Sequence, residues 1–520
     1  MNINIKQYLK APTGREIERF EHLIMMLPHA GSHARWPAFA HDKVIAQRLS
    51  RSGYKGTPAK PFTLDLPNKT GTRVSLVGIK QDISSFELLT LARELVATHM
   101  TSNPSSIAIS LPGIEAPLAA RSAEAIVSAA LAARHVMPSF KSKPDKPKKL
   151  RAIHLYLAKQ NKLDFSQCIA EAEGNNLARE LTSLPPNELT PGNYRKRVTK
   201  LAKEHGWKMD FLDTKKLKRE KAGAFLAVAQ GSPEPDAGIV HLCYTPKQQK
   251  GTRSKQSKGL ALVGKGICFD TGGTNLKPAR YMHGMHEDME GSAVALGTFL
   301  ALTQLEVNFP VDCWLALAQN HIGPRAYKQN DVVTACNGTT IEVIHTDAEG
   351  RMVLADTLAI ASRNKPAMIV DYATLTGACV QALSTRYSGA FTNKPDLVSK
   401  IIKAGEDSGE RVWPFPTEKD FDTELDSDIA DIKQCTLGGE ADHILAARFL
   451  DRFVDKKIAW VHIDLSAGNH KNGLAHIPTD ITGFGVRYTL NLVLRGKGVG
   501  VDFYASKKID TDPFSSSNNI

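Results

Sequence analysis

The sequence predicts an α/β protein of two domains, the second of which has a mostly parallel sheet flanked by helices. Three observations lead to this fold class. The chain has 520 residues, which is too long for one ordinary hydrophobic core. Short apolar segments alternate with helical segments along both halves of the chain. The composition, 42% apolar and 23% charged residues, is that of a globular protein.

Residues 1–175 are predicted to form an N-terminal α/β accessory domain. Its expected strands and helices are, in chain order, the strand 74–79, the helix 86–99, the strand 107–111, the helix 118–134 and the strand 151–158. A further helix, 164–181, ends just before Pro185 and Pro186, because proline cannot continue a helix. The domain boundary is placed near this helix.

Residues 176–495 are predicted to form the catalytic domain, and residues 496–520 a separate tail. The expected elements are the strands 222–229, 238–244 and 260–263, the helix 292–305, the strand 311–318, the helix 354–363 and the strand 367–371. Such alternation predicts a mostly parallel sheet, and ligands of such sheets collect at the carboxyl ends of the strands.

Several classes of protein are disfavoured by the composition. The sequence contains no run of eighteen apolar residues, so no membrane span is predicted. The first residues lack the pattern of a secretory signal. Seven scattered cysteines without a CxxC pair indicate reduced thiols in a cytoplasmic enzyme. The net charge of +12 would suit nucleic acid, but much of it lies in the two runs 141–151 and 247–258, which lack aromatic residues and read as solvated loops.

Ionisable residues gather between Leu262 and Arg351, in otherwise apolar surroundings. They are Lys265, Asp270, Lys277, Asp288, Asp347 and Glu349. Charged groups are seldom buried unless they are paired or hold a metal. Asp347 and Glu349, read as an extended segment, would point to the same side. Each acid alone could be a surface residue or a helix cap, but the set predicts an oxygen-rich site for divalent metal ions in a hydrolytic role.

The same segments resemble the leucyl aminopeptidase family, a group of cytosolic dinuclear-metal exopeptidases. The resemblance covers roughly residues 175 to 490 and rests on Val263-Gly-Lys-Gly266, Phe269-Asp-Thr-Gly-Gly273, Leu276-Lys-Pro278, Asn330-Asp-Val332, Thr346-Asp-Ala-Glu-Gly-Arg351 with its continuation to Asp356, and Ala373-Thr-Leu-Thr-Gly-Ala378. It implies a metalloprotease that releases N-terminal amino acids from peptides by means of a water bridging two metal ions, Mn or Zn. It also implies a homohexamer.

The family's roles carry over to matching positions. The resemblance makes Lys265, Asp270, Asp288, Asp347 and Glu349 the metal ligands, with Lys265 neutral when it binds. It makes Lys277 the group that polarises the scissile carbonyl, and Arg351 the holder of a bicarbonate ion that accepts a proton from the attacking water. The substrate-binding positions that it implies are Met285, Thr374, Leu375, Gly377 and His443.

Asp442 and His443 depart from the family, which has small or apolar residues at these two positions. Two interpretations stay open: Asp442 caps the following helix, or the pair narrows and polarises the pocket for the substrate's first side chain. The preferred N-terminal residue is therefore left undecided. Two other functions are kept as alternatives, a DNA-binding accessory protein on the same fold and a Cys-Gly dipeptidase.

Overall fold

The computed structural model describes residues 3–29, 38–143, 148–157, 161–246 and 258–495. The basic runs 141–151 and 247–258 lie partly outside these residues, and the predicted tail 496–520 lies wholly outside them. The described residues form two compact units. One unit comprises residues up to Ala172 together with Lys471–Asp480, and the other comprises Glu173–His470 and the residues that follow from Ile481.

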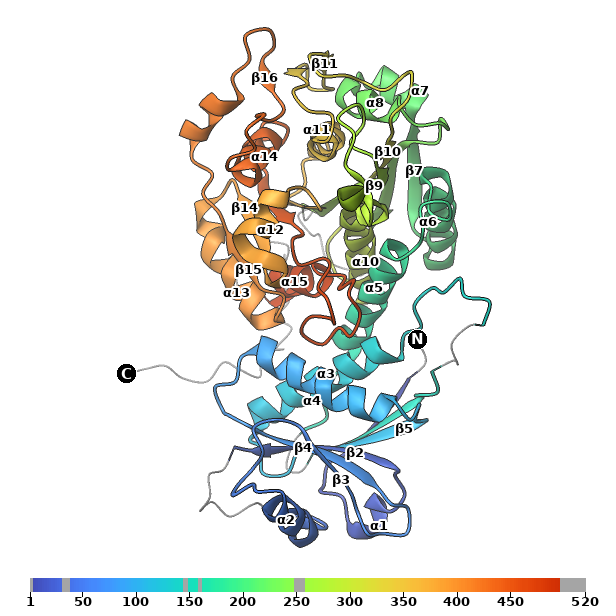
Figure 1. Ribbon diagram of the computed structural model, residues 1–520, viewed down its shortest axis with the longest axis vertical. Helices are drawn as coiled ribbons and strands as arrows, with labels where there is room; N and C mark the ends of the chain where they lie inside the picture. The colour runs from blue at the N-terminus through green and yellow to red at the C-terminus, as the bar shows by residue number, and fades with distance from the viewer. Residues whose placement is uncertain (1–2, 30–37, 144–147, 158–160, 247–257, 496–520) are drawn as a thin grey trace, which may run out of the picture. The chain divides into compact units, whose positions relative to one another are not determined.

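The first unit is built on a six-stranded sheet with the strand order β1-β6-β5-β2-β4-β3. Its neighbours run parallel except for β3 and β4. The strands are β1 (Asn4–Tyr8), β2 (His22–Pro28), β3 (Phe62–Asp65), β4 (Arg73–Ile79), β5 (Ser106–Ser110) and β6 (Ala152–Tyr156). Figure 1 shows α3 (Ser85–Met100) and α4 (Ala116–Arg134) over one face of this sheet, with α1 (Gly14–Ile17) and α2 (Asp42–Arg51) on the other.

Strand β2 shows why both faces of this sheet are covered. Its side chains alternate between the faces, as in any strand. Ile24 and Met26 belong to the core under α3 and α4, whereas Leu23, Met25 and Leu27 belong to the core that includes α1 and α2. The continuous apolar run is typical of a strand buried on both sides.

The second unit contains an eight-stranded mixed sheet with the order β15-β14-β17-β13-β9-β10-β8-β7. The central neighbours β17, β13, β9 and β10 are all parallel. The strands are β7 (Lys208–Asp213), β8 (Gly238–Tyr244), β9 (Leu260–Asp270), β10 (Val311–Asn320), β13 (Met368–Ala373), β14 (Ser388–Thr392), β15 (Val412–Pro414) and β17 (Ala459–Asp464). A small sheet, β11 (Val332–Thr334), β12 (Thr340–Glu342) and β16 (Ile432–Lys433), accompanies it.

Helices complete the second unit, which confirms the predicted α/β class with a mostly parallel catalytic-domain sheet. They include α5 (Ser166–Thr182) from Glu173 onward, α6 (Pro191–His205), α7 (Thr214–Arg219), α8 (Gly223–Ala229), α10 (Glu290–Gln304), α11 (Glu349–Ser362), α12 (Gly377–Leu383), α13 (Val398–Ser408), α14 (Asp442–Asp451) and α15 (Val486–Leu490). One continuous core joins residues of α8, α11 and α14 to the sheet. Within the described residues, no helix is long and apolar enough to cross a membrane.

Three predicted elements differ from the structure. Residues 222–229, predicted as a strand, form the buried helix α8, because a short apolar run carries no period that separates the two structures. The strand predicted at 260–263 continues to Asp270, so Lys265 lies within it. The helix predicted from residue 354 begins at Glu349, so Asp347 and Glu349 do not lie in one extended segment.

Helix α10 lies unusually close to its neighbours because small residues face them. A Cβ atom added to Gly297 would overlap the carbonyl oxygen of Gly174 in α5, and one added to Gly291 would overlap the carbonyl oxygen of Tyr372 in β13. These glycines let helix and sheet backbones approach to a distance that no other residue allows.

We expect Gly297→Ala to lower the free energy of unfolding by about 1–3 kcal/mol, because the added methyl group must push α5 away from α10. Urea denaturation measures the change. Gly438→Ala is the matched control, since nothing lies within 4 Å of its added Cβ. Equal stability of the Gly297 variant and the parent protein would show that the helix contact is looser than described.

Candidate metal centre and active site

The site lies where the central parallel strands of the second unit end. Asp270 is the last residue of β9, Asn320 the last of β10 and Asp464 the last of β17, while Thr374 directly follows β13. Asp270 and Asn320 are partners in the strand register. Since parallel strands bring their carboxyl ends to one edge, four segments distant in sequence deliver polar groups to one place.

Lys265 binds two carboxylates and a backbone carbonyl at the centre of the site. Its Nζ lies 2.7 Å from Asp288 Oδ1 and 3.0 Å from Glu349 Oε1, and it donates a hydrogen bond of 2.9 Å to the Thr374 carbonyl oxygen. The Lys265 side chain is 4% exposed. Asp288 ends the short helical turn Met285–Glu287, and Glu349 is the first residue of α11.

Lys277 enters the same site from the loop after β9. Its Nζ lies 3.0 Å from Asp270 Oδ2 and also contacts Asp347 Oδ1. Its side chain is 15% exposed, so it is the more accessible of the two lysines. The structure thus brings together all six ionisable residues that the sequence singled out between Leu262 and Arg351.

The electrostatics of the site are dominated by crowded, buried carboxylates. Burial and the neighbouring acids raise the pKa of Asp288 to about 8, that of Glu349 to about 7 and that of Asp347 to about 6, although the two lysines act in the opposite direction. Burial by itself would lower the pKa of Lys265 and Lys277. The surrounding carboxylates outweigh that effect and raise both values.

These residues fit divalent metal ions. Oxygen atoms of Asp270, Asp347 and Glu349 all lie within 4.8 Å of one another. Asp288 Oδ2 is buried without a hydrogen-bond partner among the described residues. When all of them are ionised, the four carboxylates carry more negative charge than the two lysine ammonium groups can neutralise. Each ammonium group lies between two carboxylates, at a point where a cation is favoured. A hard, oxygen-rich donor set of this kind suits divalent ions such as Mn²⁺ or Zn²⁺.

Two glycines make the close packing of the site possible. A Cβ on Gly350 would lie 2.7 Å from Lys265 Cε, so a side chain there would displace the lysine from Glu349. Gly272 has a φ of +87°, and its N–H donates a hydrogen bond of 2.8 Å to Asp270 Oδ1. The motif glycines therefore position the charged groups rather than bind anything themselves.

Both terminal nitrogens of Arg351 bind the protein itself, whereas its Nε is buried without a hydrogen-bond partner among the described residues. Its Nη1 donates a hydrogen bond of 2.9 Å to the Gln434 carbonyl oxygen, and its Nη2 lies 2.7 Å from Asp442 Oδ1. The helix-cap interpretation of Asp442 is wrong, because Ala441 holds the cap position of α14 and no side chain caps it. The Asp442 side chain turns to Arg351 instead.

Of the predicted substrate-binding residues, Thr374 contacts the cluster directly. Thr374 Oγ1 donates a hydrogen bond of 2.7 Å to Asp288 Oδ1, Leu375 N donates one of 3.0 Å to Asp464 Oδ1, and Gly377 begins α12. Met285 is half-buried, three residues before Asp288. His443, next to Asp442, lies against the Phe415 ring at 4.4 Å between centroids, and burial lowers its pKa.

Sequence reasoning missed several residues that hold the site in place. Asn320 donates hydrogen bonds of 2.8 Å to Asp270 Oδ1 and 3.0 Å to the Thr346 carbonyl oxygen. Asp464 holds the loop after β13 through Leu375 N and Thr376 Oγ1. The sequence feature that could have indicated them is their position, because each is a polar residue at the carboxyl end of a buried strand.

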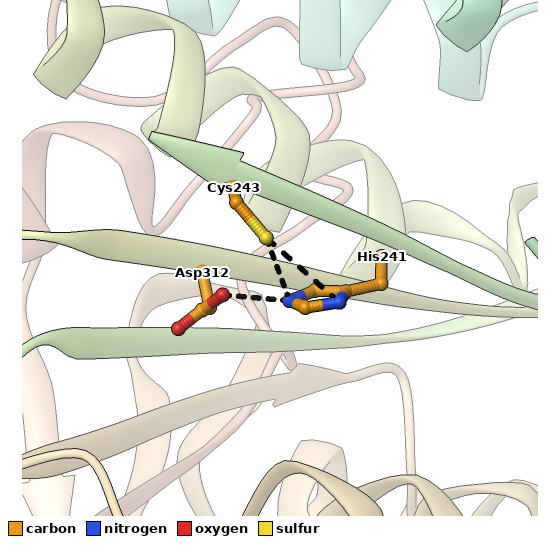
Figure 2. A group of neighbouring side chains, drawn as sticks. All are labelled: His241, Cys243 and Asp312. Atoms are coloured by element: carbon orange, nitrogen blue, oxygen red, sulfur yellow. Dashed lines mark hydrogen bonds and ion pairs between the residues drawn. The ribbon is translucent and has the colours of Figure 1, made fainter. Parts of the chain in front are cut away.

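A second cluster lies on β8 and β10, outside this site (Figure 2). His241 Nε2 contacts Asp312 Oδ1 at 2.6 Å and Cys243 Sγ at 3.2 Å. Cys243 Sγ also lies 3.8 Å from His241 Nδ1, but its shorter contact is to Nε2, the nitrogen that binds Asp312, whereas in a nucleophile–base–acid relay the nucleophile and the acid bind different nitrogens. The ring stacks on Trp314 at 3.6 Å, and burial raises the pKa of Cys243 to about 12. We interpret it as a structural His–Asp pair.

Fold and site together define a metal-dependent hydrolase, and comparisons with known proteins identify its family. The catalytic domain of the cytosol aminopeptidase family matches residues 176–490. A probable cytosol aminopeptidase of Stutzerimonas stutzeri is 36% identical over 447 residues, covering 84% of this chain and 88% of its own length. The cytosol aminopeptidase of Pseudomonas aeruginosa gives the same identity and coverage.

The structural comparison agrees. A mutant of tomato leucine aminopeptidase is similar with a TM-score of 0.80 and 30% identity, covering 95% of this chain and 97% of its own. The chain belongs to the cytosol aminopeptidase family. It is accordingly a metallo-exopeptidase with aminopeptidase activity, and the family implies divalent metal ions, as the charge of the site requires.

We expect Asn320→Ala to weaken metal binding by about 10- to 100-fold, because Asp270 and the loop at Thr346 lose the group that orients them. Competition with a fluorescent chelator measures the affinity, and circular dichroism checks the fold. Asn364→Ala changes an exposed asparagine in the turn after the C-terminal end of α11 and serves as the control. Unchanged affinity in the Asn320 variant would remove Asn320 from the site.

Proposed function

We propose that the aminopeptidase works with two divalent metal ions, Mn or Zn, held by Lys265, Asp270, Asp288, Asp347 and Glu349. The supporting observation is the excess of buried carboxylate described above, with one oxygen of Asp288 left without a partner. When bound, such a pair of ions supplies an activated water and polarises the scissile carbonyl. Lys265 binds a cation only in its neutral form, so binding displaces its proton.

Lys277 is proposed to stabilise the negative charge that develops on the carbonyl oxygen. It is the more exposed of the two lysines, and neighbouring carboxylates keep it protonated by raising its pKa. A preorganised cation at this point acts more strongly in the transition state than in the ground state. Met285, Thr374, Leu375, Gly377 and His443 are proposed to bind the N-terminal residue of the peptide.

The remaining assignments rest on the relatives and on resemblance. We propose a cytoplasmic enzyme, since the relatives are named cytosol aminopeptidases and all seven cysteines are free thiols. We also propose a homohexamer that acts on peptide substrates. Bicarbonate at Arg351 is proposed on the same resemblance: Gln434 and Asp442 bind Nη1 and Nη2 of the guanidinium, whereas Nε is buried without a hydrogen-bond partner among the described residues.

Metal removal tests the proposal. We expect chelation to abolish the release of N-terminal residues and reloading with Mn²⁺, Zn²⁺ or Co²⁺ to restore it, while peptides with an acetylated amino terminus stay uncut. A panel of aminoacyl amides, assayed together with the dipeptide Cys-Gly, identifies the preferred substrate. Absence of activity with every metal would contradict the proposal, and salt-dependent DNA binding that survives Asp347→Ala would favour the DNA-binding alternative.

We expect Lys277→Met to lower kcat by about 100- to 1,000-fold while the protein keeps its full metal content, because the transition state loses a charged partner. Steady-state kinetics and elemental analysis of the purified protein measure the two quantities. Lys328→Ala, which removes an exposed lysine, is the control. Loss of metal with unchanged kcat per bound metal would instead assign Lys277 to metal retention.

A further inference from the structure

The cluster on β8 and β10 places three different metal-binding side chains on one face of two neighbouring strands. His241 and Cys243 are two positions apart in β8, so their side chains point to the same face of the sheet. Asp312 lies directly opposite Cys243 in the antiparallel register, and Trp314 lies opposite His241. The two backbones therefore make an imidazole, a thiol and a carboxylate immediate neighbours.

The three side chains point toward one another, close enough to share one ion (Figure 2). A nitrogen of His241, the sulfur of Cys243 and an oxygen of Asp312 all lie within 4.8 Å of one another. Neighbouring ligands of a tetrahedral zinc ion stand roughly 3.3–3.7 Å apart, as bonds of about 2.0 Å to nitrogen or oxygen and about 2.3 Å to sulfur require. The contact of 2.6 Å between His241 Nε2 and Asp312 Oδ1 thus opens by roughly 0.7 Å when an ion replaces the proton between them.

The charge and the surroundings of the group also suit a divalent cation. Burial and the neighbouring Asp312 raise the pKa of Cys243 to about 12, so the thiol keeps its proton until a metal ion displaces it. Thiolate and carboxylate together then neutralise a divalent ion. The His241 and Asp312 side chains are 15% and 20% exposed, so an ion can enter from solvent. The Trp314 ring stacks on His241 with 7° between the planes, which fixes the imidazole beforehand.

This group is separate from the active site. Asp312 is the second residue of β10, whereas Asn320, which binds Asp270, is the last. Roughly 26 Å of strand, at about 3.3 Å per residue, lies between them. The donor atoms differ as well, because the active-site cluster consists of carboxylates and lysines. A thiolate with an imidazole favours Zn²⁺, Co²⁺ or Cd²⁺ over Mn²⁺, whose preferred ligands are oxygen atoms.

We propose that His241, Cys243 and Asp312 form a third metal site, which binds Zn²⁺ or a cation of similar softness through nitrogen, sulfur and oxygen, with water as the fourth ligand. The His–Asp pair described above is the metal-free form of this site. Binding releases the thiol proton to solvent and links β8 to β10 through the ion. The site is independent of the two ions proposed for catalysis, and Mn²⁺ leaves it empty.

A sulfur ligand can be detected directly. Metal-free protein is loaded with Zn²⁺, Co²⁺ or Mn²⁺ and desalted, elemental analysis gives the ions bound per chain, and absorption spectroscopy detects the sulfur-to-cobalt charge-transfer band. The same measurements are made on Cys243→Ser, whose fold is checked by circular dichroism. Cys336→Ser is the matched control, because Cys336 is also a half-buried free thiol but contacts the Asp356 backbone carbonyl instead of an imidazole.

We expect the parent protein to retain about one more zinc ion per chain than manganese ions, and to show the charge-transfer band with Co²⁺. Cys243→Ser should lose both the additional zinc ion and the band, while its manganese content stays that of the parent. Cys336→Ser should keep both.

Equal zinc and manganese contents in the parent protein, absence of the band, or a band that persists in Cys243→Ser would overturn the inference. If Cys243→Ser does not fold, alkylation of the parent by iodoacetamide replaces it. Mass spectrometry of the peptides should then show that Zn²⁺ slows modification of Cys243 and not of Cys336, and an unchanged rate at Cys243 would equally overturn the inference. Failure of the proposed function appears separately, as a protein that is inactive with every metal.

Discussion

Repulsion between carboxylates that the fold forces together is the constraint on which this structure depends. Asp270, Asp288 and Glu349 are almost fully buried, and the raised pKa values of Asp288 and Glu349, with one Asp288 oxygen left without a hydrogen-bond partner among the described residues, show that the two lysines do not balance the carboxylates. The protein tolerates such a site only because the surrounding sheet and helices fix it, and because cations can relieve it. Stability is given up locally for a strong, preorganised cation site.

The fold brings the acids together through strand order rather than sequence proximity. Parallel strands β17, β13, β9 and β10 end at one edge, and each contributes a polar residue at or just after its end. Helix α11 then places Glu349 and Arg351 at its own beginning, and Gly350 between them leaves room for Lys265. Catalysis, specificity and charge balance therefore depend on a few loops carried by a rigid sheet.

Much of the fold and of the charged site could be predicted from the sequence, but some elements and contacts could not. Strand–helix alternation predicted the fold class, but residues 222–229 were misread because eight apolar residues show no period. The family resemblance predicted the charged cluster residue by residue, and the structure gathers it. The pairing of Asp442 with Arg351 could not be predicted from the sequence, because the two residues are 91 positions apart and no local pattern links them. Asn320 was missed for a similar reason, since an asparagine ending a strand has many ordinary explanations.

The central claim is that the carboxylate cluster holds two cations side by side. Anomalous X-ray diffraction from crystals loaded with Mn²⁺, recorded on either side of the manganese absorption edge, tests it most directly. The account predicts two peaks about 3.5–4 Å apart, both within bonding distance of Asp270 and Glu349, with Lys265 and Asp288 beside one of them. A single peak, or peaks outside this cluster, would contradict it.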